Sequence, residues 1–163
     1  MDVSTFYALF AATCFTLVGL WWNVVRGRDD RMRRPALRRG VGGVCLSFLL
    51  PALMGLFAQV GGDSTPGLRR AGFTMLAVIG CVHTAGSRVR AQGRLVAVPG
   101  CDHGAAALLH LLIAVVGAVP EVARVIGLAP IQAEAVPLIL LVVLGHGLVW
   151  RFTAGEGCPA GDE

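Results

Sequence analysis

Three histidines fall inside apolar stretches of the sequence, where an ionisable side chain needs an explanation. They are His83, His110 and His146, and a fourth, His103, stands with Cys101 and Asp102 in "GCDHGAAALLH", just ahead of the apolar stretch that contains His110. Ionisable residues in membrane helices generally face the bundle interior or a wet cavity, and they are candidate functional residues by default. His83, His110 and His146 are therefore the candidate cofactor-binding residues of this chain.

Imidazole at these positions supports three kinds of chemistry. Two histidines at one depth could supply both axial ligands of a b-type haem. Three could bind a transition metal through neutral nitrogens. Groups that titrate near neutral pH could also carry protons or line a solute path. The structural interpretation is simpler, because a neutral histidine near an interface can bond a carbonyl and no spacing here is a metal signature. We expect no cofactor, with haem b or a transition metal as the alternative.

The neighbours of these histidines are small. His110 lies on a row with Ala106, Ala114 and Ala118, and Gly145 and Gly147 flank His146. Small residues let a partner helix or a flat ligand approach the backbone, and a tightly packed bundle uses them as well. Asp102 has its own explanation as the N-cap of the following helix, where its carboxylate accepts from free amides.

The elements that must position these residues are long apolar blocks. The chain of 163 residues is 55% hydrophobic, with a mean hydropathy of +0.71, and its apolar residues gather in uncharged runs. A helix needs roughly 20 such residues to cross a bilayer. We predict an all-α polytopic membrane helix bundle, one domain over 1–163, with five transmembrane helices at about 3–25, 41–60, 71–86, 104–119 and 135–152. The third is the shortest and weakest, Pro51 should kink the second, and Pro137 falls in the first turn of the fifth.

The arginines predict the orientation. All 14 basic residues are Arg, and seven of them lie in the segment Arg26 to Arg39. A segment this basic beside two spans stays in the cytoplasm, so the N-terminus is outside and the C-terminus is cytoplasmic. Aromatic residues near both edges agree, with Tyr7 at the outer edge and Trp22 at the inner one. The pair Arg69 and Arg70, at the outer start of the third span, is the one discordant feature.

The absence of several motifs argues against some classes of function. No span contains Asp, Glu or Lys, and Arg151 at the inner end of the fifth is the one arginine, so the midplane carboxylate of ion-coupled carriers is missing. The five cysteines form no CxxC pair, and no GxSxG, HExxH or Walker-type loop is present. We do not expect an enzyme. Abundant Arg, Ala, Gly and Val fit a GC-rich bacterial genome, so the basic pI is no argument for nucleic acid.

The partners we expect are those of a small membrane protein. The segment Arg26 to Arg39 could contact anionic lipid, although its simpler role is to set the topology. In the first span, Thr5, Thr13, Thr16 and Asn23 form a polar stripe that favours a helix–helix seam, within one chain or between copies. A homo-oligomer or a membrane-protein partner follows, and nucleic acid does not.

The sequence therefore predicts a multi-pass protein of the bacterial cytoplasmic (inner) membrane without catalytic activity. It would act in solute or ion passage or as an accessory subunit of a membrane complex. The alternative is a b-type haem electron carrier that uses two of the three intramembrane histidines.

Overall fold

The computed structural model describes residues 3–26, 35–61, 65–92, 101–119, 121–122, 127 and 130–154. Side chains at 35–37, 39, 87–92, 101–103, 130–131 and 154 lie outside this description. His103, the side chain of Asp102 and most of the segment Arg26 to Arg39 therefore lie outside it too. What is described is enough to define every long helix and its neighbours.

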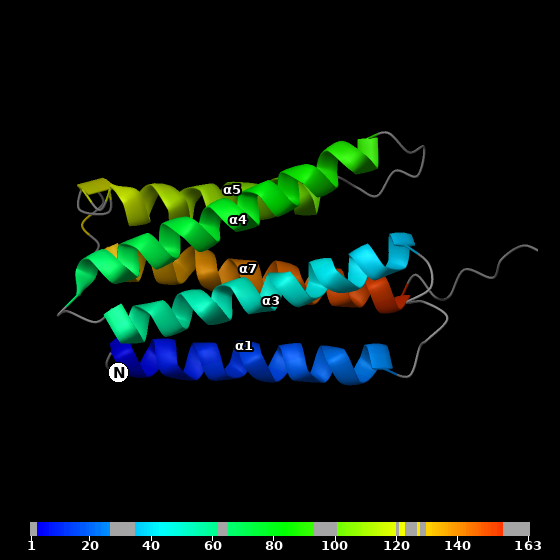
Figure 1. Ribbon diagram of the computed structural model, residues 1–163, viewed down its shortest axis with the longest axis horizontal. Helices are drawn as coiled ribbons and strands as arrows, with labels where there is room; N and C mark the ends of the chain where they lie inside the picture. The colour runs from blue at the N-terminus through cyan, green and yellow to red at the C-terminus, as the bar shows by residue number, and fades with distance from the viewer. Residues whose placement is uncertain are drawn as a thin grey trace, which may run out of the picture.

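Five long helices make up the described chain. They are α1 (Val3–Arg26), α3 (Pro35–Gly61), α4 (Pro66–Gln92), α5 (Cys101–Ala118) and α7 (Pro130–Ala154). The helices lie side by side along the long axis, and each runs opposite to the one before it in the chain (Figure 1). The predicted all-α class with five helices is confirmed.

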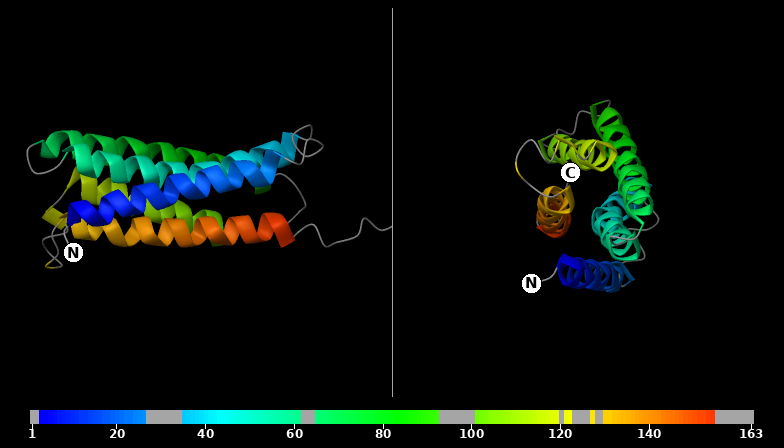
Figure 2. Two further views of the ribbon diagram at one scale, coloured as in Figure 1. Left: turned by 90° about the horizontal axis from the view of Figure 1, so that it is seen from below. Right: turned by 90° about the vertical axis from the view of Figure 1, so that its left-hand side faces the viewer.

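Four of these helices form a ring and the fifth is attached outside it. The ring is closed by the pairs α3 with α4, α4 with α5, α5 with α7, and α7 with α3. Helix α1 packs on α3, as the end-on view shows (Figure 2). Helix α3 is thus the central element, and α1 is the peripheral one.

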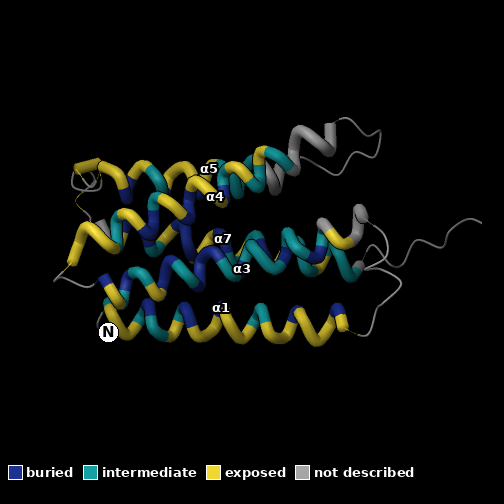
Figure 3. Tube along the Cα trace, viewed as in Figure 1, coloured by how far each residue is buried: buried dark blue, intermediate teal, exposed yellow. Residues whose placement is uncertain are grey.

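The burial pattern of α1 follows from this position. Its buried residues recur every three or four positions along one face, at Tyr7, Ala11, Cys14, Trp21 and Val25. One stripe of a helix with 3.6 residues per turn can face a neighbour while the rest stays outside. Most of α1 is therefore exposed, whereas α3 is buried or half-buried over most of its described length (Figure 3).

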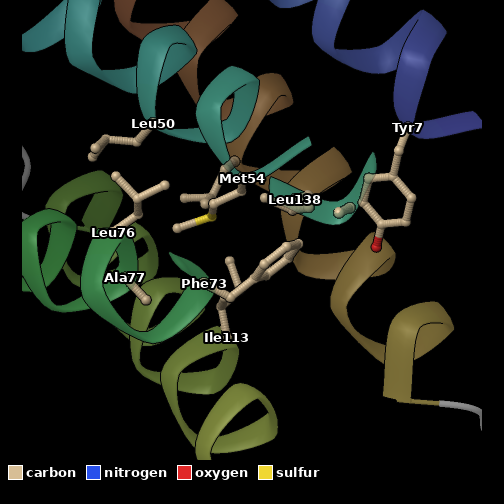
Figure 4. Packing of buried hydrophobic residues seen from close by; sticks show 10 residues of the cluster. Tyr7, Leu50, Met54, Phe73, Leu76, Ala77, Ile113 and Leu138 are labelled. Carbon is tan, nitrogen blue, oxygen red and sulfur yellow. The ribbon is translucent and has the colours of Figure 1, made fainter. Parts of the chain in front are cut away.

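Apolar side chains fill the ring. The main cluster joins Met54 of α3, Phe73 of α4, Ile113 of α5 and Leu138 of α7, each fully buried, with Tyr7 of α1 at its edge (Figure 4). A second cluster, at the other end of α1, gathers Trp21, Val25, Val41, Val44 and Phe48. Removal of apolar side chains from water stabilises the parts of a helix bundle that water would otherwise reach.

Three of the described helices are long and apolar enough to cross a membrane, in the ranges Val3–Arg26, Gly40–Gly61 and Gln132–Thr153. The apolar part of α5, Gly104–Ala118, is shorter. Helix α4 is longer than the predicted third span but carries charge at both ends. The chain is therefore a helical bundle with candidate membrane spans.

The helices extend past the apolar blocks at most ends. Helix α7 begins at Pro130, five residues before the predicted span, so Pro137 lies about two turns inside and not in the first turn. Pro51 lies within α3, and both prolines are fully buried. Helix α5 begins at Cys101, which places Asp102 inside its first turn and not ahead of it. These differences arise because a helical backbone continues through polar residues as readily as apolar ones.

Candidate functional site

His110 is the most buried of the three candidate histidines, with 4% of its surface exposed. Its Nδ1 donates to the carbonyl oxygen of Ala106, one turn earlier in α5, at 2.7 Å. A carbonyl can only accept, so the neutral ring keeps its lone pair on Nε2. Within the described chain Nε2 has no hydrogen-bond partner. The ring lies directly against Gly80 of α4, where no side chain intervenes.

His83 and His146 sit differently. His83, half-buried on α4, lies within electrostatic range of His110, and its Cε1 faces Gly43 of α3. His146 is exposed on α7; its Nδ1 donates to the carbonyl of Val142 at 2.8 Å, and its ring meets Phe48 edge-on at 5.3 Å. The structure thus brings His83 and His110 together and places His146 against α3.

The small residues around these histidines serve packing. A side chain at Gly145 would meet Ser47 and Phe48 at 2.9 Å, and one at Gly80 would meet the ring of His110. No group of three or more His, Cys, Asp or Glu side chains within the described ranges is arranged to hold a metal ion. A haem bound to His110 would require the ring to leave Gly80, so the haem alternative stays a prediction.

A second cluster of polar residues lies near the end of the bundle where α4 and α7 begin. It was not predicted as a site. Glu134 of α7 is 1% exposed, and its Oε2 has no hydrogen-bond partner among the described residues. Arg69 and Arg70 of α4 act on it electrostatically, and Arg69 has a buried Nε that is also unpartnered within the same ranges. Tyr7 of α1 is equally buried, and its hydroxyl points toward α7 (Figure 4). We call Tyr7, Arg69, Arg70 and Glu134 the glutamate end.

Two glycines position this group. A Cβ at Gly61 would lie 2.6 Å from Cβ of Arg69, so only glycine lets the start of α4 fold back so closely on the end of α3. A Cβ at Gly55 would lie 3.1 Å from Cβ of Ala11 and 3.3 Å from the Tyr7 carbonyl, which brings α1 close to α3. Three helices thereby present polar groups to one level of the bundle.

The sequence predicts Glu134 ahead of the fifth span, in a loop, and Tyr7 at the outer edge of the first. The structure differs in that α7 starts early enough to include Glu134 and α1 turns Tyr7 inward. The signal that could have identified the glutamate end was the discordant pair Arg69 and Arg70. Two arginines at the wrong end of a span require a counter-charge, and Glu134 and Glu121 are the nearby acids in the predicted outer segment.

The polar stripe of the first span faces away from the bundle. Thr5, Ala12, Thr16, Gly19 and Asn23 are all exposed, spaced seven, four, three and four residues apart. We call these five residues the outer seam of α1. Thr16 donates to the Ala12 carbonyl at 2.9 Å and Asn23 to the Gly19 carbonyl at 3.1 Å, so these donors are satisfied within the helix. The expectation of a seam inside one chain is wrong, and a seam with another chain stays a prediction.

Comparison with known proteins adds no assignment: no family model, curated protein or solved structure matches this chain.

Proposed function

We propose that this chain is a five-span protein of the bacterial cytoplasmic membrane that acts as a non-enzymatic accessory subunit. Its outer seam would bind a transmembrane helix of a partner protein. The single observation that carries the proposal is the set of small and polar residues along the exposed side of α1.

The composition of the outer seam supports contact with another helix. The exposed faces of α5 and α7 carry large apolar residues suited to lipid: Leu108, Leu111, Leu112, Val115, Val136, Ile139, Leu140 and Val143. Helix α1 also exposes Leu9, Phe15, Leu20, Trp22 and Val24, but between them it carries the Thr, Ala, Thr, Gly and Asn of the outer seam. Helix contacts in membranes favour small and hydroxyl-bearing residues, because close backbone approach replaces the hydrophobic effect there.

The position of α1 supports the same conclusion. Helix α1 is outside the ring and packs chiefly on α3, so the side opposite α3 is accessible over the whole length of the helix. From Ala12 to Asn23 the outer seam is spaced by three or four residues, which is the spacing at which a second helix keeps contact over several turns. Asn23, near one end, could fix the register of such a contact.

The interior of the ring favours an accessory role over passage of solutes. Between His110 and the glutamate end, the ring is filled by Met54, Phe73, Ile113 and Leu138, none of which has exposed surface. A path for ions or solutes needs polar groups along its length to replace hydration. Passage would require these side chains to move apart.

The experiment is site-specific photocrosslinking in native membranes. A photoreactive amino acid at Ala12 or at Thr16 should give one discrete adduct with a partner protein. The matched controls are Leu111 of α5 and Ile139 of α7, which are also exposed but large and apolar, and these should give no protein adduct. Gly19→Leu should abolish the adduct formed from Ala12.

The other outcomes contradict the proposal. An adduct of twice the chain mass would assign the outer seam to a second copy and reject the accessory role. Equal adducts from all four positions would mean that the outer seam does not differ from the rest of the exposed surface. The absence of adducts from Ala12 and Thr16 would mean that the outer seam faces lipid.

A further inference from the structure

The packing of α4 on α5 includes a histidine ring that lies on bare backbone. The ring of His110 is in contact with Gly80, and any side chain at that position would overlap it. At the neighbouring position of α4, the Cys81 thiol donates to the carbonyl oxygen of Ala107 at 3.6 Å. Both contacts join the same two helices at one level of the bundle. The position of the His110 ring therefore sets how closely α4 approaches α5 there.

The neutral form of His110 fits this contact. Its Nδ1 carries the hydrogen that is donated to the Ala106 carbonyl at 2.7 Å, so Nε2 carries a lone pair and no hydrogen. Nε2 is buried and has no hydrogen-bond partner in the ranges that the structure describes. A bare nitrogen can lie against Gly80, because it brings neither a hydrogen nor a charge into the contact.

The protonated form does not fit. Both ring nitrogens then donate, and the hydrogen on Nε2 points at a place with no acceptor among the described residues. The ring also carries a positive charge, and a buried charge without a partner is far costlier than a buried neutral polar group. His83 of α4, within electrostatic range, adds a second positive charge when it is protonated as well. A charged His110 is therefore relieved only if its ring leaves Gly80 or α4 moves away from α5.

The two packed helices supply no acid close enough to balance that charge. From Pro66 to Ala118, which spans α4, α5 and the segment between them, the one acidic residue is Asp102. It lies eight residues before His110, or about two turns along α5, so its carboxylate is out of reach of the ring. The titratable residues of α4 nearest the contact are Cys81 and His83, and its charged residues are all arginines, which only donate.

Helix α7 is the other helix that packs on α5, and its acid lies at a different level. Its titratable residues are Glu134, His146 and Arg151. Glu134 belongs to the glutamate end, and the filled part of the ring separates it from His110. His146 meets Phe48 of α3, and Arg151 lies in the last turn of α7. Neither α4 nor α7 thus offers a carboxylate at the level of His110.

We infer that His110 is a pH-sensitive latch between α4 and α5. The neutral ring holds the two helices together at Gly80, and protonation of Nε2 releases the contact. Histidine is the side chain that ordinarily changes charge in the physiological range of pH, so a latch of this kind responds to acidification. The inference is independent of what binds the outer seam, because it concerns α4 and α5 and not α1.

Spin labels on the two helices measure the release. Val82 of α4 and Leu108 of α5 lie next to the contact and are 68% and 66% exposed, so labels there leave the packing undisturbed. The full chain with V82C/L108C, in a background whose native cysteines are replaced by serine, is reconstituted in phosphatidylcholine vesicles. Pulsed electron spin resonance gives the distance between the labels from about pH 8 to about pH 4.5, which brackets the charge change of histidine. We expect the mean distance to increase by about 2 Å as the pH falls, the scale of shifts at helix interfaces.

Matched variants and a second pair of labels test which group is responsible. H110F keeps a flat ring and H110Q keeps a polar side chain, and since neither can be protonated, both should hold the distance constant with pH. H83Q should keep the increase, because the proton that releases the latch is on His110. The control pair L9C/L56C labels exposed positions of α1 and α3. It should show no change, because the contact between these helices at Gly55 involves Ala11 and Tyr7 and no histidine.

A distance between positions 82 and 108 that does not change with pH would overturn the inference without any further variant. An increase that survives in H110F and H110Q, or that disappears in H83Q, would assign the response to another group and reject the latch. An equal change in L9C/L56C would show that acid loosens the whole bundle, which also contradicts a latch at one contact.

Discussion

The two ends of this bundle handle positive charge in opposite ways. At the glutamate end, Arg69 and Arg70 lie beside a buried carboxylate, and the group is drawn inward among three helices. At the other end, Arg26 is the last residue of α1 and Arg38 lies in the first turn of α3; both are exposed, the exposed Trp22 and Trp150 lie near them, and we call this the arginine end. One end places a buried acid within electrostatic range of its arginines, and at the other end the described arginines Arg26 and Arg38 are exposed.

Under the proposed topology, this difference lets one chain obey the positive-inside rule and still place arginines at its outer side. Arginines that face an inner leaflet need no counter-charge from the protein, because the leaflet supplies it. Under that topology, arginines at the outer side have no such support, and Glu134 is the described acid that acts on them electrostatically. The pair Arg69 and Arg70, which was discordant in the sequence, thus lies near a buried acid of the same chain.

The largest effect should come from breaking the compensation at the glutamate end. Glu134→Leu removes the buried acid that acts electrostatically on Arg69 and Arg70, and a partly buried polar group left without its partner costs about 1–3 kcal/mol, more when it is charged. Equilibrium unfolding in mixed detergent micelles measures the change. Glu121→Leu, at an exposed position near the same end, is the control and should change little. An equal loss in both variants would show that Glu134 has no special role.

The packed region between the ends should be the next most sensitive. Gly80→Ala places a methyl group on the ring of His110, and overpacking of this kind costs about 1–3 kcal/mol. Gly19→Ala is the matched control, because nothing lies within 4 Å of its Cβ and alanine favours the helix by about 1 kcal/mol. The same unfolding assay applies. A neutral Gly80→Ala would mean that His110 leaves Gly80 at little cost.

A smaller effect separates the two adjacent tryptophans of the arginine end. Trp21→Phe loses the hydrogen bond to the Val41 carbonyl, and such a bond contributes about 0.5–1.5 kcal/mol. Trp22→Phe alters an exposed ring and should leave the free energy of unfolding within measurement error. Reversed sensitivities would place Trp22, and not Trp21, in the contact between α1 and α3.

The smallest effect on stability should come from the exposed arginines themselves. Arg26→Gln and Arg38→Gln should each change the free energy of unfolding by less than about 0.5 kcal/mol, as expected for surface substitutions. A loss comparable to that of Glu134→Leu would show that the arginine end is also compensated within the protein, and the contrast between the ends would disappear.

Much of the fold could be predicted from the sequence, because uncharged apolar blocks specify helices directly. The helix ends could not: α7 extends from Pro130 through Glu134, since no apolar boundary marks where a backbone stops being helical. The placement of His110 against Gly80 also depends on how two distant helices pack, and no local pattern encodes that contact. The sequence also could not show whether the polar stripe of α1 faces the bundle or its surroundings. Both the stripe and the opposite face of α1 carry residues that can pack against another helix.

The histidines remain open to the test that separates their two interpretations. The structural interpretation expects a featureless visible spectrum from protein made with adequate haem. The haem alternative predicts a Soret band with sharper bands on reduction. Replacement of His83 and His110 should then abolish those bands.

The measurement that tests the central claim most directly is the sidedness of the two ends. In a background freed of the five native cysteines, Asp63→Cys and Arg90→Cys are labelled with a membrane-impermeant thiol reagent in intact cells. We expect labelling at position 63, in the segment between α3 and α4, and none at position 90 until the membrane is permeabilised. Labelling at position 90 with protection at 63 would invert the bundle, place the arginine end outside, and contradict the account of how its two ends handle charge.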